Sequence, residues 1–240
     1  MYYMNPPAKD LSKIAGSDKV KKVQKDFEAT HVRPQRLMKT LFTDEAYVKA
    51  NVDEARLMRR LFDLACNMQS HDTDMQLYSL FTDEECYDLW SCNNLYWYLT
   101  HACSPVTDGL MPYREADLLR NILDRADAAL KEGKNQATLR FGHESCLLPL
   151  VALLELNHYG ESYPDVEKLS EQWRAYDIFP MASNVQFVFF HKKGSNDVLV
   201  KVLLNEKETK LPVKTDVAPY YHWKDVESYY REKLDKYQHI

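Results

Sequence analysis

The residues around position 143 read Thr138-Leu139-Arg140-Phe141-Gly142-His143-Glu144-Ser145, and the apolar run Cys146-Leu147-Leu148-Pro149-Leu150-Val151-Ala152-Leu153-Leu154-Glu155-Leu156 follows. Residues 137–141 are typical of a short strand, and residues 145–156 are typical of a helix that is buried on nearly every side. Such a helix needs a sheet to lie on. The pattern therefore predicts a strand-to-helix junction at residues 142–144 within an α/β layer.

Helices dominate the rest of the chain. Apolar residues recur at three- and four-residue intervals in the segments 34–42, 53–68, 83–100 and 113–131, and Gly133 is well placed to end the last of these helices. Downstream, helices are predicted over 166–175 and 223–237. Residues 1–30 are polar and Lys-rich, are broken at 16–18, and are expected to be either a surface element or a poorly anchored start.

Strands are few. Residues 185–190 and 198–204 flank a turn at 193–197 and predict an antiparallel pair, to which a third short strand at 209–212 is added. Three or four strands are too few to cover the apolar helix, so the sheet is expected to be incomplete. The fold class predicted is α/β, mostly helical, with few strands and a large helical domain.

Composition excludes several classes of protein. The chain has 240 residues, 45% hydrophobic and 28% charged, with a formal net charge of −5, which argues against nucleic acid or an anionic membrane as partner. No apolar run is long enough to span a bilayer, and residues 1–7 show no export signal. Localisation therefore stays unknown from the sequence.

Cysteine spacing predicts neither a disulfide framework nor a metal site. The five cysteines are Cys66, Cys86, Cys92, Cys103 and Cys146, an odd number in mostly apolar helical contexts. The nearest approach to a ligand cluster is Cys92, His101 and Cys103, which lacks the paired two-residue spacings of zinc sites. We expect no metal and no cofactor.

The junction has the features of an anion site. The first N–H groups of a helix have no internal partner and the helix dipole is positive there, so a phosphate can lie against them with His143 as a further donor. Gly142 lets the backbone approach closely. A protonated Glu144 can donate a proton to a departing alkoxide, which phosphomonoester cleavage requires. The alternative from spacing alone is that Glu144 and Ser145 merely cap the helix.

The run Leu139 to Leu156 resembles the C-terminal signature of the histidine acid phosphatases, in which a His-Asp pair follows a strand and opens a buried helix. Residues 179–184, the hairpin to Phe190, and the segments 200–205 and 211–212 also resemble the last strands of that family in order and spacing. Within the family, the resemblance is strongest to the multiple inositol polyphosphate phosphatases and their bacterial relatives.

The resemblance implies a mechanism through a phosphohistidine. A histidine in an Arg-His-Gly-x-Arg-x-Pro motif attacks phosphorus, and water then releases phosphate. By the same resemblance His143 contacts the transferring phosphoryl group, and Glu144 protonates the leaving oxygen where the family usually has aspartate. Arg140 is a candidate substrate-binding residue.

The nucleophile motif is not in this sequence, because the tripeptide Arg-His-Gly occurs nowhere in the 240 residues. The only place where His, Arg and Pro come close together, Thr30-His31-Val32-Arg33-Pro34, lacks the flanking Arg and Gly and is predicted to start a helix. By resemblance, residues 1–132 are the inserted helical domain and residues 133–240 are the C-terminal part of the α/β phosphatase domain. Full-length relatives are often periplasmic or secreted.

Two functions from different classes follow. The first is the C-terminal fragment of a phosphomonoesterase that hydrolyses phosphorylated small molecules such as inositol polyphosphates, inactive alone because the nucleophile is lacking. The second is a non-catalytic protein that binds a phosphorylated ligand or serves in assembly. An incomplete sheet exposes an edge, so self-association through that edge is also expected.

Overall fold

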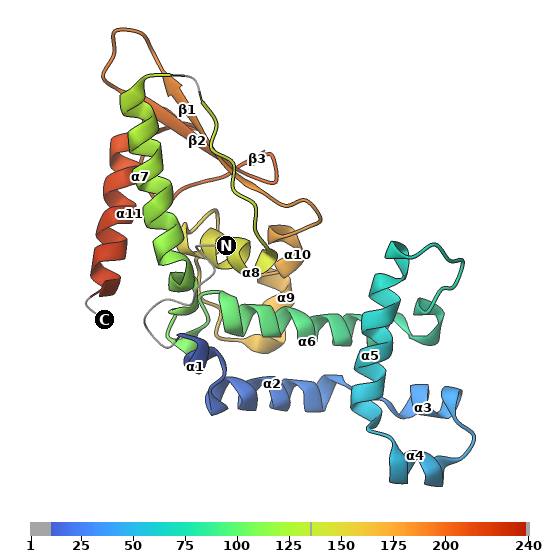
Figure 1. The fold of residues 1–240 in the computed structure, drawn as a ribbon. Helices are drawn as coiled ribbons and strands as arrows, with labels where there is room; N and C mark the ends of the chain where they lie inside the picture. The colour runs from blue at the N-terminus through green and yellow to red at the C-terminus, as the bar shows by residue number, and fades with distance from the viewer. Residues whose placement is uncertain (1–10, 135, 239–240) are drawn as a thin grey trace. The chain divides into compact units, whose positions relative to one another are not determined.

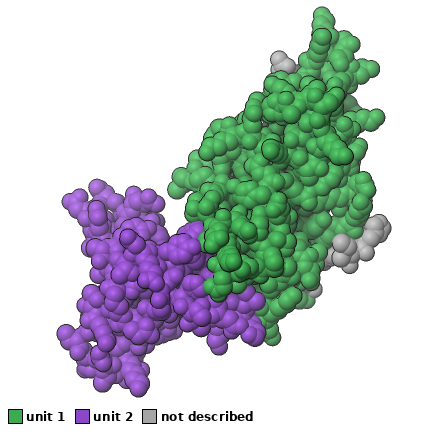
Figure 2. Space-filling view, turned by 180° about the vertical axis from the view of Figure 1, so that it is seen from behind, with its two compact units in different colours: residues 1–20, 97–240 green, residues 21–96 purple. Residues whose placement is uncertain are grey.

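The computed structural model describes residues 11–134 and 136–238, so residues 1–7, where the sequence shows no export signal, lie outside the described residues. The chain forms two compact units, shown in different colours in Figure 2. Unit 1 contains residues 1–20 and 97–240, and unit 2 contains residues 21–96. The sequence-based division into 1–132 and 133–240 stays a prediction. Within the described ranges, no helix has both the length and the apolarity that crossing a bilayer requires.

Unit 2 is helical. It contains most of α2 (Asp18–His31), α3 (Gln35–Leu41), α4 (Glu45–Asn51), α5 (Glu54–Asn67), the 3-10 helices η1 (Met68–Ser70) and η2 (Tyr78–Leu80), and the first part of α6 (Asp83–His101). Asp44 and Asp53 cap α4 and α5 by accepting a hydrogen bond from a backbone N–H of the first turn. Three predicted helices, those over 34–42, 53–68 and 83–100, are confirmed.

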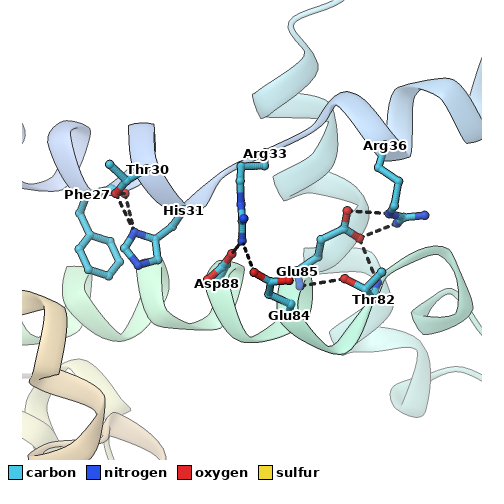
Figure 3. A network of polar contacts seen from close by, with 9 residues as sticks. All are labelled: Phe27, Thr30, His31, Arg33, Arg36, Thr82, Glu84, Glu85 and Asp88. Atoms are coloured by element: carbon cyan, nitrogen blue, oxygen red, sulfur yellow. Dashed lines mark hydrogen bonds and ion pairs between the residues drawn. The ribbon is translucent and has the colours of Figure 1, made fainter.

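Two arginines join the segment after α2 to the start of α6 (Figure 3). Arg36 donates to both carboxylate oxygens of Glu85, and this pairing lowers the pKa of that carboxyl group. Glu85 also accepts from the backbone N–H of Thr82, while Thr82 Oγ1 accepts from the N–H of Glu85, which is a capping box. Arg33 donates to Glu84 at 2.8 Å and to Asp88 at 2.6 Å. Ion pairs therefore connect these residues to the start of α6.

The segment Thr30 to Pro34, predicted to start a helix, instead ends one helix and leads into the next. His31 closes α2, where its Nδ1 lies 2.9 Å from both Thr30 Oγ1 and the Phe27 carbonyl oxygen, and its ring stacks on Phe27 (Figure 3). Pro34 then precedes α3 directly. The histidine is thus held by local helix contacts.

The helices of unit 1 surround one buried helix, α8 (Glu144–Leu153). Besides the ends of α2 and α6, the others are α1 (Leu11–Ala15), η3 (Pro105–Thr107), η4 (Met111–Glu115), α7 (Ala116–Glu132), η5 (Val166–Lys168), α9 (Leu169–Gln172), α10 (Ala175–Ile178) and α11 (Trp223–Gln238). The predicted helices that correspond to α7, α8 and α11 are confirmed. Gly133 ends α7 at φ 65°, a conformation that glycine adopts without strain.

One small sheet lies beside these helices (Figure 1). Strands β1 (Val185–His191) and β2 (Val198–Leu204) pair antiparallel over their whole length, from Val185 opposite Leu204 to His191 opposite Val198. Strands β3 (Lys207–Glu208) and β4 (Tyr221–His222) also pair antiparallel with β2. Alternate residues of β2 are buried, and α11 packs against this strand. The predicted hairpin is confirmed.

The prediction of a strand at 137–141 is wrong, because the structure has no strand at these residues. The segment has no strand neighbour among the described residues, and Leu139 and Phe141 are 76% and 95% exposed. The sequence shows only that these residues favour an extended conformation. A strand also needs a neighbouring backbone with which to form a ladder of hydrogen bonds.

Two other sequence predictions need correction. The helix predicted over 166–175 is broken, because Trp173 and Arg174 are extended between α9 and α10 and the Trp173 side chain is fully buried. The third strand lies at β3 and not at 209–212, since Lys210 exchanges two hydrogen bonds with the loop residue Asn157. In both places tertiary packing overrides local propensity.

A test of this packing uses Tyr230, a fully buried residue of α11 whose hydroxyl donates to the Leu154 carbonyl oxygen at 2.7 Å. We expect Tyr230→Phe to lower the free energy of unfolding by about 1–3 kcal/mol, since it leaves a buried carbonyl without its donor. Urea unfolding measures the change. The control Tyr47→Phe alters an exposed ring and is expected to stay within about 0.5 kcal/mol. Equal effects of the two variants would contradict the role given to this hydrogen bond.

Candidate functional site

His143 and Glu144 lie where the chain turns from an extended segment into α8. His143 is the N-cap residue, with φ −122° and ψ 165°, and Glu144 is the first residue of the helix. Both side chains are exposed, and His143 makes no side-chain capping hydrogen bond in the described structure. An exposed His143 also agrees with the alternative in which Glu144 and Ser145 only cap the helix, so the anion site stays a prediction.

The first turn of α8 offers backbone donors. The N–H groups of Cys146 and Leu147 both donate to the His143 carbonyl oxygen at 3.0 Å. Those of Glu144 and Ser145 precede them, and helix geometry gives such groups no partner within the helix. Two backbone donors and the positive end of a helix dipole thus lie next to the exposed His143. An anion such as a phosphate fits this arrangement.

Helix α8 is held rigidly from behind. The six residues from Leu148 to Leu153 are buried, and the helix packs against η4 and α10. Its far end is tied down as well, because Tyr230 bonds the Leu154 carbonyl oxygen and Lys233 donates to that of Leu153 at 2.8 Å. Packing therefore fixes the direction in which the first turn of α8 points.

Arg140, the third candidate, has a partner on another helix. Its guanidinium donates to the side-chain oxygen of Asn121 on α7 at 2.9 Å. The contact is exposed, and it directs the arginine to α7 in the described structure. A role of Arg140 in ligand binding stays a prediction.

One residue near α8 was not found from the sequence. Glu115, the last residue of η4, is 4% exposed, and its carboxyl group hydrogen-bonds with the thiol of Cys146 in the first turn of α8. Burial raises the pKa of Glu115 to about 7. The sequence indicated its burial only through spacing. Residue 115 lies four positions before Leu119, so at helical spacing it falls on the apolar stripe of α7.

A second buried titratable group lies in the same unit. Burial lowers the pKa of His101 to about 4, and the positive charge of Arg114 contributes in the same direction. His101 Nδ1 lies 2.7 Å from Thr100 Oγ1. The imidazole is therefore neutral at physiological pH and belongs to the packing of α6.

A pocket of about 340 Å³ lies at the opposite end of α8, where Ala152, Leu153 and Glu155 line it. A ten-residue helix rises about 15 Å, so this pocket is remote from His143 and Glu144. The cation in its lining, Lys233, is already paired with Glu155 at 3.0 Å. The candidate anion site is instead an open surface at the other end of the helix.

Comparison with known proteins relates this chain to a family. The profile of the histidine phosphatase superfamily (branch 2) matches residues 1–205. Human multiple inositol polyphosphate phosphatase 1 is 28% identical over 134 residues, which cover 50% of this chain and 27% of the human protein. The chain therefore spans about a quarter of that relative.

Solved structures of a bacterial protein share the fold. The Bifidobacterium longum multiple inositol polyphosphate phosphatase in complex with phosphate superposes with a TM-score of 0.64 at 20% identity, covering 97% of this chain and 58% of that one. Its complex with inositol hexasulfate gives a TM-score of 0.59 at 19% identity, covering 91% and 53%.

The few strands and many helices described above thus match a histidine phosphatase-like fold, over little more than half the length of the solved relatives. The family profile extends over most of the sequence, from the first residue into the turn after β2. This chain belongs to branch 2 of the histidine phosphatase superfamily.

Proposed function

We propose that this chain supplies the phosphate-binding and proton-donating part of a phosphomonoesterase that acts on phosphorylated small molecules such as inositol polyphosphates. The observation that carries the proposal is the exposed pair His143 and Glu144 at the N-terminus of α8, beside backbone donors without helical partners. Relatives named as inositol polyphosphate phosphatases, one of them crystallised with phosphate, support the substrate class.

Each residue has a role that fits its position. His143 and the first-turn N–H groups bind the phosphoryl oxygens, and Glu144 gives its proton to the leaving oxygen of the substrate. The attack on phosphorus falls to a histidine outside these 240 residues, since the sequence contains no Arg-His-Gly. Turnover needs the nucleophile and the proton donor to be held together in the right geometry, and this chain supplies only the proton donor. The chain alone is therefore expected to bind the phosphorylated ligand but not to hydrolyse it.

The proposed binding is tested by calorimetric titration with inositol hexakisphosphate. We expect His143→Ala to weaken binding by about tenfold, which corresponds to the loss of one charge-assisted hydrogen bond, and Glu144→Gln to bind at least as tightly as the native chain. His158→Ala, which removes an exposed histidine elsewhere in unit 1, is the matched control. Unchanged affinity in His143→Ala would contradict the site.

The same preparations distinguish an incomplete enzyme from a complete one. No phosphate is expected to be released from inositol hexakisphosphate or an aryl phosphate at acidic pH. Release that disappears in Glu144→Ala would mean that a residue within this chain acts as nucleophile.

The exposed segment 137–141 has a further role in the proposal. Leu139 and Phe141 are among the most exposed apolar residues described, and the backbone here lacks a strand neighbour in the described structure. An extended, apolar segment without a partner pairs readily with another chain. We therefore propose that two copies associate through it when nothing else covers it.

Light scattering at increasing protein concentration tests the association. The native chain is expected to shift from monomer to dimer, and the double variant Leu139→Ser with Phe141→Ser to stay monomeric. Met181→Ser removes another apolar side chain of similar exposure, 94%, and is expected to dimerise like the native chain. A native chain that stays monomeric at every concentration would refute this proposal.

A further inference from the structure

Glu115 places a buried carboxyl group directly behind the first turn of α8. Its residue is 4% exposed, and η4, which it ends, packs more extensively against α8 than against any other helix. One oxygen takes part in the hydrogen bond with the thiol of Cys146. The other, Oε2, is buried without a hydrogen-bond partner in the described part of the chain. A carboxylate in such a place is costly, so the neutral acid is favoured.

Few charged groups face this carboxyl group. Arg114 precedes it and is the one cation that lowers its pKa, and the Cys146 thiol acts in the same direction. On the other elements packed against η4, Lys13 of α1, Asp117 of α7 and Glu144 of α8 are exposed to solvent. Burial prevails over Arg114 and Cys146, and the pKa of Glu115 rises to about 7. The group therefore changes charge near neutral pH.

The position of Cys146 sets the distance to the proposed anion site. Cys146 follows Glu144 by two residues, which is about 3 Å along the helix axis. An ionised Glu115 would therefore lie close to an anion bound at the first turn, and like charges at short range repel each other.

We propose that Glu115 is a positioning residue for the anion site at the N-terminus of α8, which in its protonated state lets a phosphoryl ligand bind there and in its ionised state repels that ligand. The inference rests on the proposed function, because it gives that site its pH dependence. Cys146 connects Glu115 with the anion site, because its thiol is hydrogen-bonded to the Glu115 carboxyl group and its backbone belongs to the first turn of α8.

The experiment is titration with inositol hexasulfate at acidic and mildly alkaline pH, because sulfate esters keep their charge throughout this range. Binding to the native chain is expected to weaken with rising pH by about three- to tenfold more than binding to Glu115→Gln. The native chain and Glu115→Gln differ only at residue 115, so the difference between them reports this residue. Glu115→Asp and Glu132→Gln, the latter at an exposed residue of α7, are expected to keep the full pH dependence.

The pH dependence of the free energy of unfolding is a second measurement that needs no ligand. It also shows whether the variant is folded. The folded chain holds the Glu115 proton up to about pH 7, whereas a glutamate in the unfolded chain releases it near the ordinary value of 4.5. The folded state thus binds more protons in this window, so the free energy of unfolding falls as pH rises through it and levels off above. Glu115→Gln is expected to lack this part of the decline.

The outcomes separate this inference from the proposed function. Equal pH dependence of binding or of stability in the native chain and Glu115→Gln overturns the inference alone. No binding at either pH, or binding that His143→Ala leaves unchanged, overturns the proposed function and the inference with it.

Discussion

Six consecutive residues of α8, Leu148 to Leu153, are buried, and this demand for enclosure organises unit 1. Helix η4 lies against α8, α10 packs on it, and two residues of α11 bond the carbonyl oxygens at its end. His143 and Glu144 lie at the N-terminus of this helix, so its packing positions them. The open geometry of the site is thus a consequence of packing at the other residues of α8.

The site combines exposure with a buried neighbour. His143 and Glu144 face solvent, while Glu115 lies behind them without a full set of partners in the described structure. Buried charge is tolerated in proteins where it has a partner or a task. An ionised Glu115 would add a negative charge behind this surface, and a ligand with several negative groups is sensitive to such a change.

Patterns that depend on one segment could be read from the sequence. The stripe of α7, the glycine that ends it, the apolar run of α8 and the hairpin of β1 and β2 all follow from periodicity and turn residues, and the structure confirms them. Features that need a partner could not be read in this way. Residues 137–141 have strand propensity but no neighbour in the described structure, Trp173 breaks a predicted helix by becoming buried, and Glu115 meets Cys146 from 31 positions away.

The direct test of the account is an NMR titration of the chain with inositol hexasulfate, followed through the backbone amide signals. With the ligand at the first turn of α8, the largest shift changes are expected at the amides of Glu144 and Ser145, and His143→Ala is expected to need about tenfold more ligand to reach them. Largest changes at Cys103 and Leu153 would place the ligand in the pocket at the other end of the helix and would contradict the central claim.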